Sequence, residues 1–265
     1  MKVEIVYPED GWFLQRVGEY LVNGIRFAKG SIRYPNEKKK FDITYFINYW
    51  LYRPCNSEIV GGYFTHEEKR REKRFKSVGQ KVDFAVHMCE RYKKVLDGKC
   101  KHNYIIYQPN DLKRLKPKLI LGYASRHYPS GRKGEELLNV VSKLPFVEIK
   151  MASGNYNFEN MVDFYNSVDY ILITSKIEGG PMSLTEGLAC GKEIITTDVG
   201  MVPKLKGCKY VHVYDREKPD DLVKLLREFY AKRIKRRKCV EQFSIENFIE
   251  NHKNLFLQIY DELHK

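Results

Sequence analysis

Short apolar runs alternate with stretches of helical spacing along the whole chain. The run from Asp169 to Ser175 is mostly apolar and β-branched, as expected of a strand buried on both faces of a parallel sheet. The residues from Val3 to Tyr7 and from Lys118 to Ala124 form similar short runs. Trp12 to Gly24 and Ile245 to Leu263 instead carry apolar residues at helical spacing. This alternation predicts α/β layers on parallel sheets.

Each half of the chain contains such a series. Further strands are predicted at 41–49, 58–63, 82–86, 104–110, 146–150 and 209–213, and further helices at 88–96, 135–144, 160–168 and 219–230. Pro117 breaks regular structure within 112–118 and predicts a linker there. A chain of 265 residues can form two small domains. We predict one at 1–115 and one at 116–240, followed by a helical segment at 241–265.

The run after the strand at 169–175 carries the most specific chemical signal. Glu178 is followed by a Gly-Gly-Pro turn at 179–181 and by a helix-compatible stretch at 183–190 that contains Glu186. Glycine permits unusual dihedrals and close backbone approach, and proline suits the first turn of a helix. A helix that begins beside such a loop presents N–H groups and a positive dipole end to a phosphate. Carboxylates accept hydrogen bonds from sugar hydroxyls, so the run predicts a nucleotide-sugar site.

This run resembles the Glu-x7-Glu signature of the family 4 retaining glycosyltransferases, here in a compact form. The resemblance continues through a strand and glycine loop at 191–203 and covers about 35 residues. The sequence departs from the family at Glu193, where proline is usual, and at Lys204, where glutamate is usual. The resemblance implies a GT-B fold, in which two Rossmann-like domains face a cleft and the last helix crosses back to pack on the first domain.

The resemblance also implies roles for individual residues. Glu178 would contact the donor sugar, Glu186 would bind the ribose hydroxyls, and the loop amides would hold the diphosphate. The loop residues concerned are Gly179, Gly180, Pro181, Met182, Ser183 and Leu184.

A second segment, which follows the strand at 118–124, resembles the family's Gly-x-x-x-Arg and Lys-Gly elements. It supplies Arg126 and Lys133 as the cations that would neutralise the donor diphosphate. Such cations are needed because the leaving nucleoside diphosphate gains negative charge as the glycosidic bond breaks. Arg132 is the alternative to Lys133 if the register is shifted by one residue.

The first half carries weaker signals. His66 ends the segment 61–66, which resembles the family's strand with a histidine that reaches the donor sugar near the reacting carbon. Gly11 lies in the first strand-to-helix loop, which in the family approaches the phosphate and the acceptor. We therefore predict Glu178, His66, Arg126 and Lys133 as catalytic residues and assign Gly11 to the nucleotide-sugar site.

The sequence offers no Asp-x-Asp pair placed to bind a metal-bound diphosphate. We therefore expect a metal-independent reaction with no cofactor beyond the nucleotide-sugar donor, in which the cations and the helix start supply the positive charge. Retention of configuration is implied by the resemblance. No enzymic nucleophile stands out, so the expected scheme is front-side attack by the acceptor hydroxyl, with the departing phosphate oxygen taking its proton.

Composition limits where the protein works. The apolar fraction is 43%, and no apolar run approaches the ~20 residues of a membrane span. The first residues are too charged for a signal peptide, and the six cysteines form no Cys-x-x-Cys pair. These features predict a soluble cytoplasmic protein, with a peripheral position on a membrane as the alternative.

A net charge of +13 calls for an explanation. Residues 1–115 carry 23 Lys and Arg against 14 Asp and Glu, and residues 116–265 carry 24 against 20. The densest stretches, 69–76 and 232–238, are either solvated helix faces or surfaces that attract a polyanion.

Together these features predict a glycosyltransferase that moves a sugar from a UDP- or GDP-linked donor to an acceptor hydroxyl. The acceptor is open, with DNA or an anionic membrane glycolipid among the candidates. The alternatives are a DNA-base-modifying glucosyltransferase of viral type and a non-catalytic nucleotide-sugar-binding protein.

Overall fold

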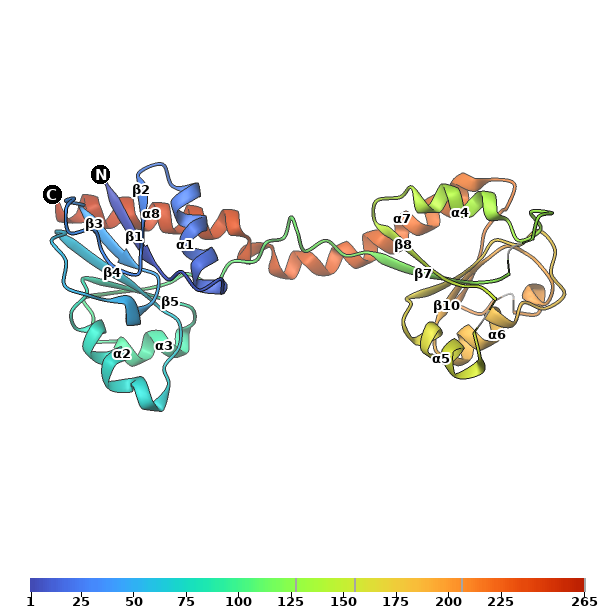
Figure 1. The fold of residues 1–265 in the computed structure, drawn as a ribbon, viewed down its shortest axis with the longest axis horizontal. Coiled ribbons are helices and arrows are strands. Elements are labelled where there is room, and N and C mark those ends of the chain that lie inside the picture. Colours follow the sequence, from blue (N-terminus) through green and yellow to red (C-terminus); the bar gives the residue numbers. More distant parts are fainter. Residues whose placement is uncertain (127, 155, 206, 265) are drawn as a thin grey trace. The chain divides into compact units, whose positions relative to one another are not determined.

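The computed structural model describes residues 1–126, 128–154, 156–205 and 207–264. The chain divides into two compact units, Met1–Arg114 with Val240–Lys265, and Leu115–Cys239. Each unit contains one parallel sheet with helices on both faces (Figure 1). The predicted fold class, α/β with two Rossmann-like domains, is therefore confirmed. No described helix is long and apolar enough to span a membrane.

The first unit has a six-stranded sheet in the order β2-β1-β3-β4-β5-β6. Val3 of β1 lies opposite both Ala28 and Ile43, so β1 separates β2 from β3. The strands are β1 (Val3–Tyr7), β2 (Ala28–Ile32), β3 (Ile43–Phe46), β4 (Ile59–Phe64), β5 (Phe84–His87) and β6 (His102–Ile105). The helices are α1 (Phe13–Gly24), α2 (Glu72–Gly79), α3 (Glu90–Leu96) and α8 (Ile245–Leu263), with short 3-10 turns η1 (Tyr49–Leu51) and η2 (Lys69–Arg71).

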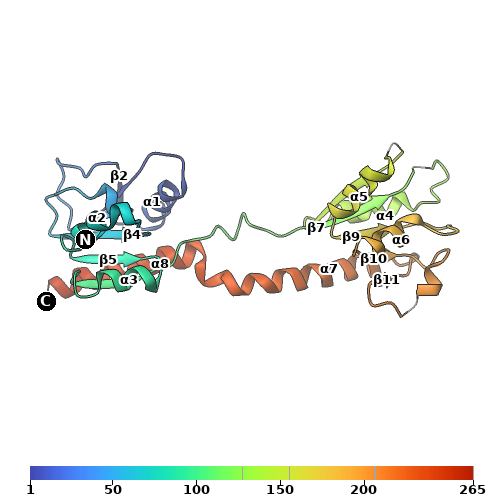
Figure 2. The ribbon, with the colours of Figure 1, turned by 90° about the horizontal axis from the view of Figure 1, so that it is seen from below.

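Helices cover the two faces of this sheet in pairs, as Figure 1 shows, and Figure 2 gives the view from the side of α2 and α3. α1 and α8 pack on the face that presents Tyr63 and Phe84, whereas α2 and α3 pack on the face that presents Phe64 and Ala85. Successive strand residues thus point to opposite sides, as the pleat requires. The sheet is buried on both faces, and the last helix of the chain returns to the first unit as predicted.

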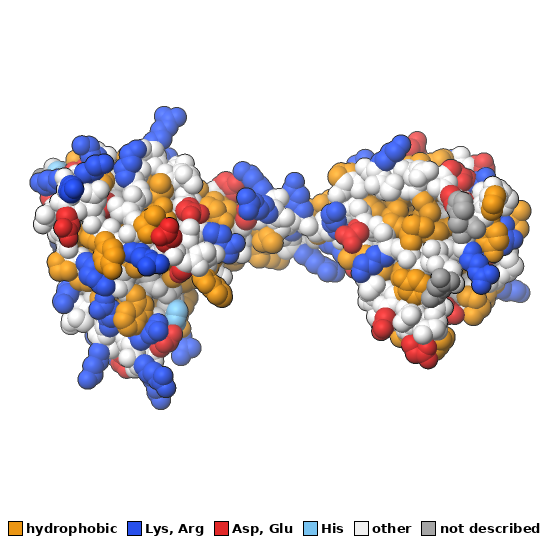
Figure 3. Space-filling model, in the orientation of Figure 1, with side chains coloured by type: hydrophobic (Ala, Val, Ile, Leu, Met, Phe, Trp, Pro, Cys, Tyr) orange, Lys and Arg blue, Asp and Glu red, His pale blue; other side chains and the backbone are white. Residues whose placement is uncertain are grey.

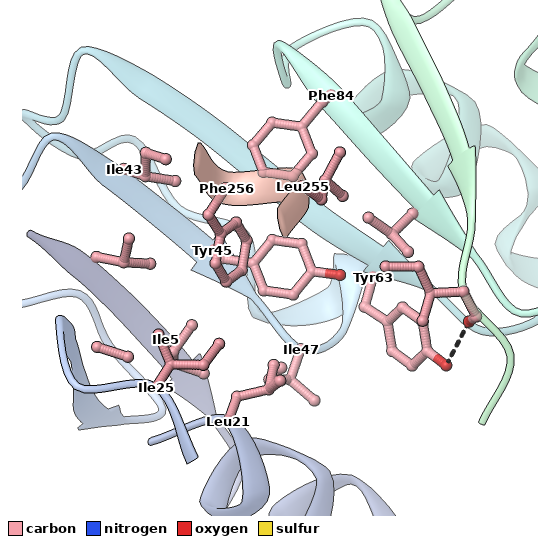
Figure 4. Close-up of a cluster of buried hydrophobic side chains, with 14 of the residues drawn as sticks. Ile5, Leu21, Ile25, Ile43, Tyr45, Ile47, Tyr63, Phe84, Leu255 and Phe256 are labelled. Carbon is pink, nitrogen blue, oxygen red and sulfur yellow. Dashed lines mark hydrogen bonds between the residues drawn. The ribbon is translucent and has the colours of Figure 1, made fainter. Parts of the chain in front are cut away.

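A buried polar contact lies in the core between the sheet and α8. Figure 4 shows Tyr45 among the apolar side chains of this core. Tyr45 packs against Phe84 and Phe256, with ring centroids 5.7 and 5.2 Å away. Its hydroxyl lies 3.1 Å from Nε2 of His252, and Nδ1 of His252 lies 3.0 Å from the carbonyl oxygen of Phe248. A carbonyl only accepts, so Nδ1 carries the proton and Tyr45 donates to Nε2. Burial lowers the pKa of His252 to about 4, which keeps the ring neutral at neutral pH.

The second unit has a five-stranded sheet in the order β11-β10-β9-β7-β8. The strands are β7 (Leu119–Ala124), β8 (Val147–Ala152), β9 (Tyr170–Ile173), β10 (Glu193–Thr196) and β11 (Val211–Val213). The helices are α4 (Glu135–Ser142), α5 (Phe158–Asn166), α6 (Met182–Ala189) and α7 (Pro219–Lys235). The 3-10 turn η3 (Val202–Leu205) precedes β11, and η4 (Arg236–Phe243) follows α7.

This sheet too is covered on both faces (Figure 1). α4 and α7 pack on Leu172 and Ile195, whereas α5 and α6 pack on Ile171 and Ile194. The chain leaves β7 for β8 on one side and comes back to β9 on the other side of β7. The loops after β7 and β9 therefore diverge. Sheets of this kind bind ligands in the crevice at such a switch point, outside the carboxyl ends of the strands.

Two elements of the first unit were not predicted from the hydrophobic pattern. β2 is an edge strand with the sequence Ala-Lys-Gly-Ser-Ile, and only Ala28 is buried, so it lacks a strand's apolar run. α2 overlaps the basic stretch at 69–76, and its buried side consists only of Phe75, Val78 and Gly79. Both elements are short and are held by their neighbours more than by their own sequence.

The return of α8 changes the charge balance of the units. Residues 240–265 carry 2 Lys against 5 Asp and Glu. With this segment included, the first unit carries 25 Lys and Arg against 19 Asp and Glu, and the second carries 22 against 15. The net charges are thus +6 and +7. The excess is shared between the folded units, although the first half of the sequence alone holds most of it.

Candidate functional site

A cavity of about 400 Å³ lies at the carboxyl ends of β7, β8 and β9, at the switch point of the second sheet. Its walls come from the loops after these strands, from α5 and from the start of α6. Four charged residues predicted for the site line it together: Arg126, Lys133, Glu178 and Glu186. Two cations thus face the same space as two carboxylates. Tyrosines 123, 128, 156 and 165 supply much of the remaining wall.

Glu178 is held by two neighbours at the edge of this cavity. Its Oε1 forms an ion pair with Nζ of Lys133 and accepts a hydrogen bond of 2.8 Å from Oγ of Ser175. The side chains of Lys133 and Glu178 are only 13% and 15% exposed, and Ser175 is buried at the end of β9. The carboxylate is therefore fixed in direction, with its second oxygen left for a ligand.

The loop that carries Lys133 is fastened against the end of β9. The carbonyl oxygen of Lys133 accepts hydrogen bonds from Oγ1 of Thr174 at 2.5 Å and from the hydroxyl of Tyr123 at 3.4 Å. Gly134 has a φ of 72°, and a Cβ there would lie 2.0 Å from the carbonyl oxygen of Thr174. Only glycine satisfies both conditions, so the Lys-Gly pair places the lysine beside Glu178.

Of the two neighbouring cations in this loop, Lys133 fits the predicted role in the site and Arg132 does not. Arg132 is exposed, places its guanidinium 3.9 Å from the ring centroid of Tyr128, and does not line the cavity. Arg126 does line the cavity, and its side chain is exposed at the rim. An exposed arginine at the rim and a half-buried lysine inside offer two donors to an anion.

Glu186 lies in the second turn of α6 and is anchored by a tyrosine of α5. The hydroxyl of Tyr165 donates to Oε2 of Glu186 at 2.5 Å, and Tyr165 is only 2% exposed. Burial, together with the hydrogen bond to Glu186, raises the pKa of Tyr165, so the hydroxyl stays a donor at neutral pH. Tyr165 and Ser175 are site residues that the sequence analysis missed. Each acts over a contact in space, and no local motif marks either one.

The start of α6 presents a positive end to the cavity. The helix begins at Met182 after the N-cap residue Pro181, and the first N–H groups of a helix have no carbonyl of their own helix to bind. Met182 is exposed and Ser183 is buried, and both line the cavity. Leu184 differs from the other loop residues, because its N–H donates to the carbonyl of Pro181 and its side chain packs in the core.

The two glycines before α6 do not adopt the unusual dihedrals that glycine permits, but they leave the space that a close approach of the backbone to a ligand needs. Neither Gly179 nor Gly180 has a positive φ; that conformation occurs at Gly200, with φ of 55°. A Cβ at Gly200 would lie 2.4 Å from the carbonyl oxygen of Gly179, so the packing of the two loops requires glycine there. A Cβ at Gly179 would meet nothing within 4 Å, and one at Gly180 would meet only Sδ of Met201 at 3.5 Å. The protein itself thus leaves this space open, which suits close approach of a ligand.

The candidates of the first unit lie at the carboxyl edge of its own sheet. His66 follows β4, is 53% exposed, and has Nδ1 3.1 Å from Oγ1 of Thr65 and Nε2 3.2 Å from Oε1 of Glu68. Gly11 follows β1 with a φ of 73°, and its N–H donates to Oε1 of Gln15 at 2.7 Å. β1 and β3 form the switch point of this sheet, so Gly11 lies where a second ligand would be expected.

Residues 147–243 match the family described as "Glycosyl transferases group 1". The match covers Glu178, Glu186 and the loop between them, which is the part of the chain that builds the floor of the cavity. This part of the second unit is therefore similar to a glycosyltransferase domain. A comparison with curated protein sequences finds no match.

Solved structures resemble the chain over nearly its whole length. A sucrose-phosphate synthase from Thermosynechococcus elongatus has 11% identity and a TM-score of 0.40, covering 99% of this chain and 100% of its own. The lipopolysaccharide outer core galactosyltransferase WaaB has 14% identity and a TM-score of 0.40, with coverages of 97% and 99%. Anabaena HepE in complex with UDP-glucose has 10% identity and a TM-score of 0.41, with coverages of 97% and 100%. At these values the likeness alone does not establish a shared activity.

Proposed function

We propose that the protein is a retaining glycosyltransferase that moves a sugar from a nucleoside diphosphate donor to an acceptor hydroxyl. The observation that carries the proposal is the gathering of Lys133, Glu178 and Glu186 around one cavity at the switch point of the second sheet. These residues are separated by up to 53 positions in the sequence, and only the fold brings them together. The match of residues 147–243 to a glycosyltransferase family supports the same conclusion.

The donor would lie across the start of α6. Glu186 accepts hydrogen bonds from the ribose hydroxyls, and Tyr165 fixes its other oxygen. The diphosphate occupies the open space before α6, where the N–H groups of Gly179, Gly180, Met182 and Ser183 and the cations Arg126 and Lys133 surround it. The free oxygen of Glu178 then accepts from a hydroxyl of the donor sugar.

Lys133 has a double role in this arrangement. Without donor it is paired to Glu178, which spares both groups the cost of an unpaired, largely buried charge. A diphosphate that enters beside Glu178 offers the lysine further acceptor oxygens. Because negative charge grows on the leaving phosphate as the sugar bond breaks, this contact is strongest in the transition state. The proposed reaction takes its positive charge from protein groups and assigns no step to a metal or cofactor.

The sugar transfer itself is assigned to the substrates. In the front-side scheme the acceptor hydroxyl attacks the anomeric carbon on the face that the diphosphate leaves. The departing phosphate oxygen accepts the hydroxyl proton, so configuration is retained. Glu178 orients the sugar and forms no covalent bond in this scheme, in keeping with its fixed carboxylate. His66 and the loop at Gly11 are assigned to the acceptor side.

The proposal is tested by release of nucleoside diphosphate from a panel of UDP- and GDP-sugars. We expect one donor to be hydrolysed slowly without acceptor, and Glu178→Gln to lower that rate about a hundredfold. Glu148→Gln is the matched control, since Glu148 is an exposed glutamate of β8 outside the cavity. A wild-type protein that hydrolyses no donor, or a Glu178→Gln variant as active as the control, would refute the proposal.

A further inference from the structure

Helices α2 and α3 form a strongly basic layer on one face of the first unit. We define the basic layer as residues 66–101, which carry 12 Lys and Arg against 6 Asp and Glu. On the opposite face α1 carries one basic and one acidic residue, and residues 240–265 with α8 carry 2 Lys against 5 Asp and Glu. The basic layer thus holds 12 of the 25 Lys and Arg of the first unit but only 6 of its 19 Asp and Glu. Figure 3 shows Lys and Arg side chains projecting from the end of the first unit where Figure 1 places α2 and α3.

Two arginines of the basic layer hold it against the rest of the first unit. Arg71 and Arg74 lie with their guanidinium carbons 4.7 and 4.9 Å from the ring centroid of Trp50. Arg74 also donates to the carbonyl oxygen of Trp50 at 3.0 Å, and Arg71 pairs with Glu68 at 3.2 Å. These two arginines thus contact Trp50, and they fasten η2 and α2 to the loop after β3.

Three other cations of the same segment point to solvent. Lys69, Arg70 and Lys73 are exposed, and the structure records no ion pair for them with any described residue. Lys69 and Arg70 lie in η2 and Lys73 lies in the first turn of α2, so the three cations lie within five consecutive residues. η2 begins three residues after His66. These cations therefore lie close to His66, at the carboxyl edge of the first sheet, where we place the acceptor.

We propose that the basic layer binds the surface of an anionic lipid bilayer and so brings the enzyme to an acceptor carried by lipid. The proposal adds a membrane partner to the proposed function. It rests on the proposed function only in taking the lipid-borne molecule as the acceptor of the sugar. Anionic headgroups need no shaped pocket, and several exposed cations on one face attract them additively. Glu68 and Glu72 lie next to these cations in the sequence, but they pair with Arg71 and Lys76. Lys69, Arg70 and Lys73 therefore keep their charge for such headgroups.

A bilayer fits this layer better than nucleic acid does. Single strands are bound by aromatic side chains that stack on bases, beside a basic groove. Residues 66–101 are all described, and none of their large apolar or aromatic side chains is among the exposed ones. Eight of the 12 cations are lysines, which act as point charges toward headgroups. The same lack of exposed apolar residues means that attachment rests on charge and weakens with salt.

The test is co-sedimentation with vesicles of phosphatidylcholine, with and without phosphatidylglycerol. We expect the wild type to bind only the vesicles that contain phosphatidylglycerol and to be released by salt. The triple variant Lys69→Ala/Arg70→Ala/Lys73→Ala should bind about a hundredfold more weakly, at roughly fivefold for each cation. The matched control is Lys38→Ala/Lys39→Ala/Lys40→Ala, which removes the same charge from the exposed loop between β2 and β3.

Three results would overturn the proposal. The wild type could fail to bind either vesicle, the two triple variants could lose binding equally, or the protein could shift duplex DNA while ignoring the vesicles. Nucleotide-sugar hydrolysis in solution is measured on the same preparations. A wild type that binds vesicles but hydrolyses no donor would defeat the proposed function and leave the lipid surface standing, so the two failures are distinguishable.

Discussion

The contact between Tyr165 and Glu186 gives a sharp prediction about donor binding. In Tyr165→Phe the ring still fills its buried place in α5, and only the hydroxyl that donates to Oε2 of Glu186 is lost. The carboxylate is then free to rotate and must be reoriented when the ribose binds. We therefore expect Tyr165→Phe to weaken nucleotide binding without removing any group that touches the reacting atoms.

The magnitude follows from the kind of hydrogen bond. A hydrogen bond to a charged group contributes about 1.5–3 kcal/mol. Glu186 lines the cavity and keeps access to water, which replaces part of the lost contact. The lower end of the range is therefore appropriate, and about 1.4 kcal/mol corresponds to a tenfold higher Kd for the donor. Ribose contacts act equally on ground state and transition state, so KM should rise while kcat changes little.

The assay is calorimetric titration with the donor, followed by steady-state kinetics. Tyr214→Phe is the matched control, because Tyr214 is also buried in the second unit, donates to the carbonyl of Ile173 at 3.3 Å, and does not itself line the cavity. Both variants lose one tyrosine hydroxyl from a buried position. Equal donor affinity in Tyr165→Phe and wild type, or a loss confined to kcat, would refute the reasoning.

Three further predictions concern charge and backbone. Lys133→Met should weaken binding of the nucleoside diphosphate about tenfold or more by titration, and Arg132→Met should not. Gly134→Ala should displace its loop and abolish donor binding, because a Cβ there meets Thr174, whereas Gly131→Ala has free space and should cost only about 1–2 kcal/mol in thermal unfolding. The free energy of unfolding of the first unit should fall as the pH drops from 6.5 to 4, because His252 has a pKa near 6.5 in the unfolded chain and about 4 in the folded chain. Denaturant titrations should show a loss that approaches about 3 kcal/mol. The variant His252→Leu should show no such loss.

Much of the second unit could be predicted, because its inner strands β7 and β9 are apolar runs that are largely buried. The predicted strand at 118–124 corresponds to β7 (Leu119–Ala124). In the first unit, the predicted helix at 245–263 coincides with α8. β2 escaped prediction because it lies at the edge of its sheet and places a lysine, a glycine and a serine between two apolar residues. Where burial is one-sided or slight, the apolar pattern carries little information.

The residues of the candidate site also fall into a group that the sequence predicts and a group that it does not. Glu178, Glu186 and Lys133 occur in local motifs, and the structure places all of them around one cavity. Tyr165 and Ser175 support these residues through contacts that no spacing encodes, since Tyr165 reaches Glu186 from a different helix. The charge balance was also hidden, because α8 is distant in sequence and adds its acidic residues to the first unit.

The central claim is that the cavity of the second unit binds a nucleotide sugar through Glu186. Calorimetric titration of UDP- and GDP-sugars into the wild type and Glu186→Ala tests it most directly. We expect one donor to bind the wild type and Glu186→Ala to lose about tenfold to a hundredfold in affinity, as the loss of hydrogen bonds to a carboxylate predicts. If no donor binds, or if Glu186→Ala binds the donor as tightly as the wild type, the account is wrong.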